Sequence, residues 1–337
     1  MLVLGIESSC DDTSVAVVSD NRQILANVIF SQEIHNLFGG VVPEIAARKH
    51  VDNIDLTYEV ALQKANVSIN DIDVIAATCG PGLIGGVIVG ATFGKVIAVT
   101  TNKPFYAINH IEGHALSARL IYPELEFPYL LLLASGGHCV ICVVRGVTDF
   151  EILGSTIDDS VGETFDKVAK MLGLKYPGGP EIEKHAKNGN ANRYILPHPL
   201  CNKSTCDMSF SGLKTAVRNI IMADDFKNSD VDDMCASFQK TLCEVLLKKC
   251  SLALNTEHVE SIVVSGGVAA NMALRTTLEM LAKENGIKFF APPISICTDN
   301  AAMIAWDCIE RISAGFSSNS INFRPTPRWK LGETLKQ

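Results

Sequence analysis

Two histidines four residues apart are the residues of this chain best suited to chemistry. Residues 109–114 read Asn-His-Ile-Glu-Gly-His, so His110 and His114 lie one turn apart if the segment is helical. Two neutral imidazoles on one helix face can bind one metal ion. Glu112, between them, points to another face and is a poor third ligand. Such a pair also occurs in helices that bind no metal, so the hypothesis needs a further ligand.

The order of the expected elements along the chain points to a third ligand. In the first half we expect strands at residues 2–7, 14–18, 27–30, 74–78 and 105–108, and helices at 43–65, 83–99 and from 110 onward. In the second half we expect strands at 130–134, 139–144, 151–153, 262–264 and 288–290, and helices at 161–172, 231–254, 269–285 and 300–314. The repeated order predicts two α/β units with helices on the sheet faces. The apolar, Gly-rich helix at 83–99 is expected to be buried.

Asp299 occupies in the second half the place that His110 occupies in the first, at the start of the helix after the fifth strand. If a pseudo-twofold axis relates the halves, these helix starts face each other across a cleft. Asp299 then joins the two histidines, and two imidazoles with one carboxylate are a set typical of iron(II) with open positions. The alternative role for Asp299 is an N-cap on the helix from residue 300.

Composition restricts the class of protein. The chain has 337 residues, of which 47% are hydrophobic and 20% charged, a normal globular balance. Its net charge is −8 and no stretch of the sequence forms a basic arm, so contact with nucleic acid needs a local patch or a partner. The first residues read as a strand rather than a signal peptide, and no apolar run reaches the roughly 18 residues of a membrane span. We expect a cytoplasmic protein that does not enter membranes.

The eleven cysteines have no regular spacing, which indicates reduced thiols. Cys139 and Cys142 form a Cys-x-x-Cys, but three residues apart on a strand they face opposite sides and are interpreted as packing residues.

We place the first half at residues 1–125, with the helix at 300–314 packing back on it. The second half follows at 126–299 with an insertion at about 175–230, and a tail covers 315–337.

Small, polar turns follow strands in both halves. One is Ser-Gly-Gly-His at 135–138 and another is Ser-Gly-Gly at 265–267. Small residues at such turns allow phosphate oxygens to approach main-chain N–H groups. The sequence therefore predicts an anion or nucleotide site beside these turns.

Five segments together resemble the bacterial TsaD family, the tRNA threonylcarbamoyladenosine transferases, formerly described as glycoproteases. They are Gly-Ile-Glu-Ser-Ser-Cys-Asp-Asp-Thr-Ser, Gly-Gly-Val-Val-Pro-Glu-Ile-Ala-Ala-Arg, Asn-His-Ile-Glu-Gly-His, Ser-Gly-Gly-His and Ser-Gly-Gly-Val-Ala-Ala-Asn. The resemblance runs from Leu2 to about Trp329. It implies the actin-like, sugar-kinase-like ATPase fold, in which two RNase H-like halves flank a cleft.

The resemblance also implies an acyltransferase reaction. The family moves a threonylcarbamoyl group from threonylcarbamoyl-AMP to the N6 amine of the adenosine 3′ to the anticodon, and AMP is released. The tRNAs concerned read codons that begin with A. The expected partners are tRNA, a shorter actin-like subunit (TsaB) and a small P-loop ATPase (TsaE).

Site residues carry over from the family as expectations. One iron ion, with zinc as the alternative, would be held by His110, His114 and Asp299, and a tyrosine that ligates in some relatives would be Tyr129. A pocket for the adenylate or for ATP would use Leu133, Ala134, Ser135, Gly136, Gly137, Asp166, Gly179, Glu183 and Asn271. Within it Gly136 and Gly137 would cradle the phosphate, Asp166 or Glu183 would accept from ribose hydroxyls, and Asn271 would meet the adenine or ribose edge.

The general base stays unassigned, with His138 and Asp11 as open candidates. Asp12 stands where many relatives have Glu, which puts in doubt any role that needs the longer side chain.

Three other functions are compatible with parts of this pattern. A sugar or acetate kinase shares the fold, but it needs a carboxylate base and Mg-ATP rather than two helical imidazoles. A metalloprotease would need His-Glu-x-x-His, which the chain lacks. A non-catalytic scaffold would have no use for the metal ligands.

Overall fold

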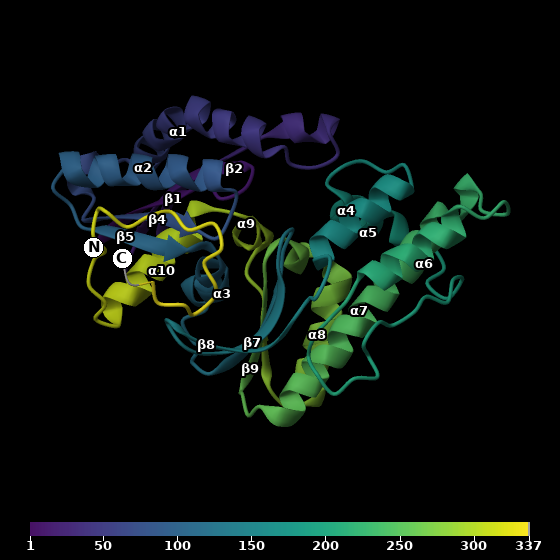
Figure 1. Ribbon diagram of the computed structural model, residues 1–337. Coiled ribbons are helices and arrows are strands. Elements are labelled where there is room, and N and C mark those ends of the chain that lie inside the picture. The colour runs from purple at the N-terminus through teal and green to yellow at the C-terminus, as the bar shows by residue number, and fades with distance from the viewer. Residues whose placement is uncertain (336–337) are drawn as a thin grey trace. The chain divides into compact units, whose positions relative to one another are not determined.

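The computed structural model describes residues 1–335, which form two compact units. Unit 1 comprises Met1–Glu124, Gly146–Asp149 and the chain from Thr298 onward, whereas unit 2 comprises Leu125–Arg145 and Phe150–Cys297. Each unit contains a five-stranded sheet with helices packed on it (Figure 1).

The sheet of unit 1 has the strand order β3-β2-β1-β4-β5. Its strands are β1 (Leu2–Glu7), β2 (Asp12–Ser19), β3 (Ile24–Ser31), β4 (Val74–Gly80) and β5 (Phe105–Asn109). The first three run antiparallel to their neighbours, and β4 and β5 continue the sheet in parallel with β1. Short 3₁₀ turns, η1 (Glu33–Leu37) and η2 (Ile69–Asp71), lie in its connections.

Helices cover both faces of this sheet, as Figure 1 shows. On one face lie α1 (Pro43–Ala65) and α2 (Ile84–Thr100), and on the other lie α3 (His110–Ile121) and α10 (Ala301–Ser313). Residues 3–7 of β1 are therefore buried on both sides, which explains why the strand reads as a nearly continuous apolar run. The run ends at Glu7, a charged residue without exposed surface.

The sheet of unit 2 has the order β10-β9-β6-β7-β8. Its strands are β6 (Tyr129–Ala134), β7 (Cys139–Gly146), β8 (Asp149–Ser155), β9 (Ser261–Ser265) and β10 (Lys288–Phe290). β6 and β7 are antiparallel, while β6, β9 and β10 are parallel. This is the same succession of a hairpin followed by parallel strands as in unit 1.

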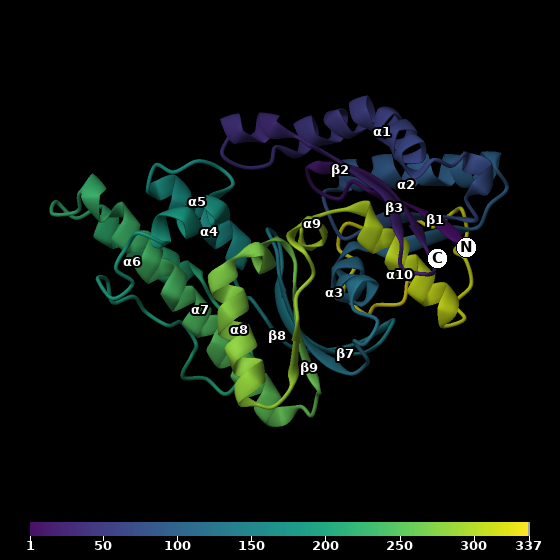
Figure 2. The same cartoon turned by 180° about the vertical axis from the view of Figure 1, so that it is seen from behind.

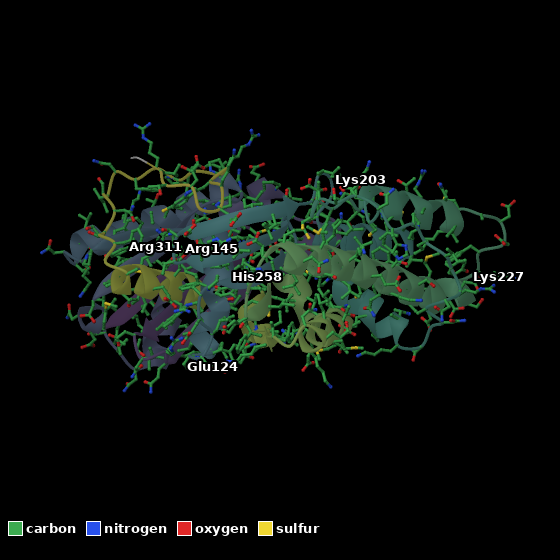
Figure 3. All side chains as sticks on the ribbon, turned by 90° about the horizontal axis from the view of Figure 1, so that it is seen from below. Glu124, Arg145, Lys203, Lys227, His258 and Arg311 are labelled. Carbon is green, nitrogen blue, oxygen red and sulfur yellow. The ribbon has the colours of Figure 1, made fainter. Side chains whose placement is uncertain are left out.

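The helices of unit 2 build its core against this sheet. They are α4 (Val161–Met171), α5 (Gly178–Ala186), α6 (Ser211–Ile221), α7 (Val231–Thr256), α8 (Met272–Glu284) and the short α9 (Ile294–Cys297), with 3₁₀ turns η3 (Asn228–Asp230) and η4 (Gly267–Ala270). The long helices α7 and α8 lie side by side (Figure 2). Phe165 of α4 and Phe238 of α7 meet edge to face with ring centroids 5.3 Å apart. Lys203 and Lys227 mark the ends of the segment that carries α6 (Figure 3).

The expected elements are present, with three differences. β2 begins at Asp12, so the polar turn before it is shorter than expected. The helix expected at 269–285 begins at Met272, because Asn271 caps it and η4 precedes it. The expectation that the helix at 83–99 is buried is wrong for one face of α2, where side chains are 44–63% exposed: Ile84, Ile88, Val96 and Val99. Its glycines face the sheet instead, so uniform hydropathy did not reveal which side was covered.

All eleven cysteines lie in the described part of the chain and are free thiols. Cys139 and Cys142 are both buried in β7, and burial raises the pKa of the Cys142 thiol to about 12. They serve as small apolar side chains there. None of the helices within residues 1–335 is both long and apolar enough to cross a bilayer.

We predict that Gly5→Ala destabilises unit 1. An added Cβ would overlap the carbonyl oxygen of Ala301 and come within 2.9 Å of the Ala305 nitrogen, so α10 must move off β1. Overpacking of this kind costs about 1–3 kcal/mol. Gly212→Ala in α6 is the control, since its nearest new contact is an ordinary 3.9 Å. The urea concentration at the unfolding midpoint should fall for Gly5→Ala and stay at the wild-type value for Gly212→Ala. Equal midpoints for the two variants would contradict the close packing of β1 against α10.

Candidate functional site

The histidine pair sits on the first turn and a half of α3. The side-chain oxygen of Asn109 caps this helix by accepting from the main-chain N–H groups of Ile111, at 2.9 Å, and Glu112, at 3.4 Å. His110 and His114 then share one face, with ring centroids 4.7 Å apart. Both imidazoles are buried, so a cation bound between them would be shielded from bulk solvent.

Asp299 lies against both imidazoles, and all three residues belong to unit 1. Its Oδ1 is 3.1 Å from His114 Nε2 and 3.6 Å from His110 Nε2. The potential ligand atoms of the three residues lie within 4.8 Å of one another. Asp299 is not the helix cap, because Asn300 Oδ1 accepts from the main-chain N–H of Met303. The structure thus brings together the three residues expected to bind a metal.

Glu7 sets the orientation of His110. Its Oε2 lies 2.9 Å from His110 Nδ1, and the hydroxyl of Ser9 is 3.1 Å from the same nitrogen. The Nδ1 proton is directed to Glu7, so Nε2 is the nitrogen that faces Asp299 and that would ligate a metal after losing its own proton. A carboxylate behind a ligating histidine is the usual outer partner of a metal site. The donor set and its outer partner therefore fit a divalent cation.

The electrostatics of this site favour positive charge. Burial alone lowers the pKa of His110, but the carboxylates of Glu7 and Asp299 outweigh it and raise that pKa to about 9. Burial also raises the pKa of Asp12 to about 7, and the negative charges of Asp299 and Asp11 add to the effect. Carboxylates that repel one another in this way are stabilised by a cation between them.

Glu7 is a functional residue that the sequence patterns did not identify. Its signal was a carboxylate at the end of an otherwise apolar, buried strand, which is rare without a partner. The partners are His110, Ser9 and Thr78, whose hydroxyl donates to Glu7 Oε2 at 2.5 Å. Glu112, in contrast, turns away from the imidazoles to Arg311, as expected from its place on the helix.

The second group of expected residues lies in unit 2, around the turn between β6 and β7. The turn is closed by two hydrogen bonds, from the Ser135 N–H to the His138 carbonyl and from the His138 N–H to the Ser135 hydroxyl, at 2.8 and 3.1 Å. Leu133 and Ala134 are buried at the end of β6. A Cβ on Gly136 or Gly137 would meet no heavy atom within 4 Å, so the turn borders open space.

The start of α4 fixes the carbonyl groups of this turn. The Ser160 hydroxyl donates to Gly136 O at 2.5 Å, and the Gly162 N–H donates to Ser135 O at 3.2 Å. In a trans peptide the N–H points opposite to the C=O. The N–H groups of Gly136 and Gly137 therefore point away from α4, an arrangement suited to an anion. Sequence reasoning missed Ser160 and Gly162, because their contacts to the turn are distant along the chain.

The remaining expected residues connect neighbouring elements of unit 2. Asp166 accepts from the Gly178 N–H at 2.7 Å, and Glu183 accepts from the Met272 N–H at 2.8 Å. Asn271 caps α8, and its amide nitrogen donates to Gln239 at 2.8 Å. These polar side chains thus tie α4, α5, α7 and α8 to one another.

The turn after β9 and two further expected residues lie in different surroundings within unit 2. Gly266, whose φ is +89°, lies so close to Ala134 that a Cβ could not fit there. Gly179, at the start of α5, borders open space. Tyr129 is buried at the start of β6, and its ring stacks on Phe127.

The two candidate bases have different surroundings. Asp11 lies in the turn between β1 and β2 of unit 1, where it adds negative charge near Asp12. His138 lies in the turn of unit 2, between β6 and β7. Neither arrangement assigns the base.

Comparison with known proteins agrees with this description. The family model "TsaD: tRNA N6-adenosine threonylcarbamoyltransferase" matches residues 23–306. Proteins named tRNA N6-adenosine threonylcarbamoyltransferase from Rhizobium etli and Rickettsia rickettsii are 51% and 52% identical. The matches cover 99% of this chain and 96% of the Rhizobium protein, and 98% of both chains for the Rickettsia protein.

A solved structure supports the fold. Full-length HypF, in a phosphate- and nucleotide-bound form, superposes with a TM-score of 0.63 at 13% identity, over 94% of this chain and 56% of that one. At that identity the likeness concerns the fold alone, which is actin-like. The length of the sequence matches sets aside the kinase, protease and scaffold alternatives. From its sequence, its two repeated α/β units and its matches, the chain belongs to the TsaD family of tRNA N6-adenosine threonylcarbamoyltransferases.

Proposed function

We propose that this chain transfers a threonylcarbamoyl group from threonylcarbamoyl-AMP to the N6 amine of the adenosine 3′ to the anticodon, in tRNAs that read codons beginning with A. The observation that carries the proposal is the triad of His110, His114 and Asp299, backed by Glu7, in a chain of this family. In the reaction, N6 bonds to the carbamoyl carbon and the bond from that carbon to the phosphate oxygen breaks. AMP leaves with the electron pair, and N6 loses a proton.

The adenylate is assigned to unit 2. The main-chain N–H groups of Gly136 and Gly137 bind its phosphate, and Ser160 keeps them aimed by holding the Gly136 carbonyl. Asp166 and Glu183 serve the ribose. A cavity of about 440 Å³ between α5, α7 and α8 is lined by Gln239, the partner of Asn271, but by none of the nine residues assigned to the adenylate.

The metal site is assigned to iron(II), with zinc as the alternative. His110, His114 and Asp299 hold the ion, and Glu7 keeps the Nδ1 proton in place so that Nε2 can ligate. When bound, the ion supplies a Lewis acid that orients and polarises the threonylcarbamoyl group.

The tRNA requires partners. The net charge of −8 opposes an anionic substrate whose phosphates dominate affinity. We assign the exposed apolar face of α2, formed by Ile84, Ile88, Val96 and Val99, to a TsaB-like actin-like subunit, with α1 beside it. A TsaE-like P-loop ATPase is the third component. The enzyme works in the cytoplasm, where its tRNA substrate is found.

Metal binding provides the first test. We predict close to one iron or zinc per chain after anaerobic loading, and at least a tenfold loss of affinity in His110→Ala, His114→Ala and Asp299→Ala, because each removes one of three ligands. His198→Ala is the matched control, since that imidazole pairs with Glu244 at an exposed position of unit 2. Elemental analysis measures the metal content, and competition with a chromophoric chelator measures the metal affinity. Full metal content in His110→Ala/Asp299→Ala would refute the site.

The glycine turn provides the second test. Gly136→Val should weaken AMP binding by roughly tenfold or more, because its methyl groups occupy the space assigned to the phosphate, while nothing within 4 Å opposes the new Cβ. Gly136→Ala should show a smaller effect. Calorimetric AMP titrations measure the affinity, and thermal melts check the fold. An unchanged affinity in a folded Gly136→Val protein would move the phosphate elsewhere.

Reconstitution provides the third test. With threonylcarbamoyl-AMP and unmodified tRNA, this chain alone should give little modified nucleoside. Adding TsaB- and TsaE-like partners with ATP should raise the yield by orders of magnitude, because partners supply the positive surface that the chain lacks. Mass spectrometry of digested tRNA measures the product. Ile88→Asp on the α2 face should abolish the stimulation, and Thr215→Asp, at an exposed position of α6 in unit 2, serves as a charge control. Multiple turnover by the isolated chain at physiological salt would contradict the argument.

A further inference from the structure

The C-terminal tail, residues 315–335, has no helix or strand of its own but is firmly attached to unit 1. Asn319 pairs with β5 through two hydrogen bonds, from its N–H to Phe105 O at 2.8 Å and from the Ala107 N–H to its side chain at 2.9 Å. Further along, Phe323 and Trp329 are buried with ring centroids 5.4 Å apart. A segment without regular structure that buries two aromatic rings is part of the core rather than a loose end.

The tail then crosses the loop that follows β4. The Thr326 N–H donates to Cys79 O at 2.7 Å, and the Gly82 N–H donates to Pro327 O at 3.3 Å. Gly80 has φ +138°, and any side chain there would overlap the carbonyl of Thr326. The loop and the tail are therefore in direct main-chain contact, with no side chain between them.

The end of the tail reaches the start of α3. The amide nitrogen of Asn109 donates to the carbonyls of Lys330, at 3.2 Å, and Trp329, at 3.4 Å, while its oxygen caps the helix. The N–H of Gly332 donates to Glu112 Oε1 at 3.1 Å. One tail segment thus contacts the residue before His110 and the residue between the two histidines.

Glu112 is itself held from the other side. Its second oxygen bonds to Arg311 of α10, labelled in Figure 3, and Arg311 also bonds to Asp307 at 2.7 Å. Glu112 and Asp307 have almost no exposed surface. A carboxyl group buried this deeply holds its position strongly, because losing a partner leaves a buried polar group without a hydrogen bond.

We propose that residues 326–333 of the tail are part of the metal-binding machinery, fixing the first turn of α3 through Asn109 and Glu112 and so holding His110 and His114 in ligating positions. Both residues are positioning residues rather than ligands. The inference rests on the metal site of the proposed function. His110 is the first residue of its helix, where the helix would otherwise fray, and a metal tolerates deviations of only about 0.2 Å in ligand distance.

Trp329→Ala tests the proposal, because it loosens the tail without altering Asn109, Glu112 or a ligand. We expect Co²⁺ to bind about tenfold more weakly, the range for residues that support metal ligands. We also expect faster hydrogen–deuterium exchange in a peptide covering residues 109–121 of the metal-free protein. Trp329→Phe should recover part of the Co²⁺ affinity and of the exchange protection, since the ring can still pack on Phe323 but the indole hydrogen bond to Glu333 O is lost. Phe316→Ala, a half-exposed aromatic in the same tail, should change neither.

A second variant covers the case in which Trp329→Ala does not fold. Glu333 accepts from the Lys330 N–H at 3.1 Å and has no part in the core, so Glu333→Ala should loosen the same segment mildly and shift both readouts in the same direction. A folded Trp329→Ala or Glu333→Ala protein with wild-type Co²⁺ affinity and wild-type exchange would overturn the role of the tail. If His110→Ala also leaves Co²⁺ affinity unchanged, the metal site itself has failed, which is a separate result.

Discussion

The hydrogen bond between Glu7 and His110 is the contact on which the proposed metal centre depends. It joins the last residue of the central strand β1 to the first residue of α3, and it decides which imidazole nitrogen faces Asp299. The carboxylate is fully buried and held by Thr78 and Ser9 as well. Because a buried carboxylate is costly without such partners, the strand end, the helix start and the turn between β1 and β2 constrain one another.

The turn between β6 and β7 of unit 2, the proposed anion site, follows a different principle, since its expected anion-binding groups belong to the main chain. Small residues are the only sequence signature of such main-chain groups. The direction of each N–H is therefore set by the partner that binds the carbonyl on the opposite side of the same peptide. Ser160 and Gly162 do this by binding the carbonyls of Gly136 and Ser135. In unit 1 a buried side chain, Glu7, orients another side chain, whereas in unit 2 a hydroxyl and a main-chain N–H orient main-chain groups.

Sequence patterns predicted the repeated order of elements and the histidine spacing, because both depend on short-range periodicity. The repeat also pointed to Asp299 as the third residue of the triad. What they could not supply were contacts over long separations, such as that of Glu7 with His110 or of Gly332 with Glu112, more than a hundred residues away in each case. Hydropathy likewise could not tell the covered side of α2 from its exposed side, because the helix is apolar all round and only its glycines distinguish the two.

Those glycines bring α2 into direct contact with the chain that leads to the metal centre. The Ser8 hydroxyl donates to Gly86 O at 2.9 Å and accepts from the Gly90 N–H at 3.1 Å, so the helix main chain touches the residue next to Ser9. The opposite side of the same helix is the exposed apolar face. The distance from that face to the Ser8 main chain is thus about the 10 Å diameter of one helix. A displacement of α2 would therefore reach Ser9, which contacts His110, through the short Ser8 side chain and the peptide that follows it.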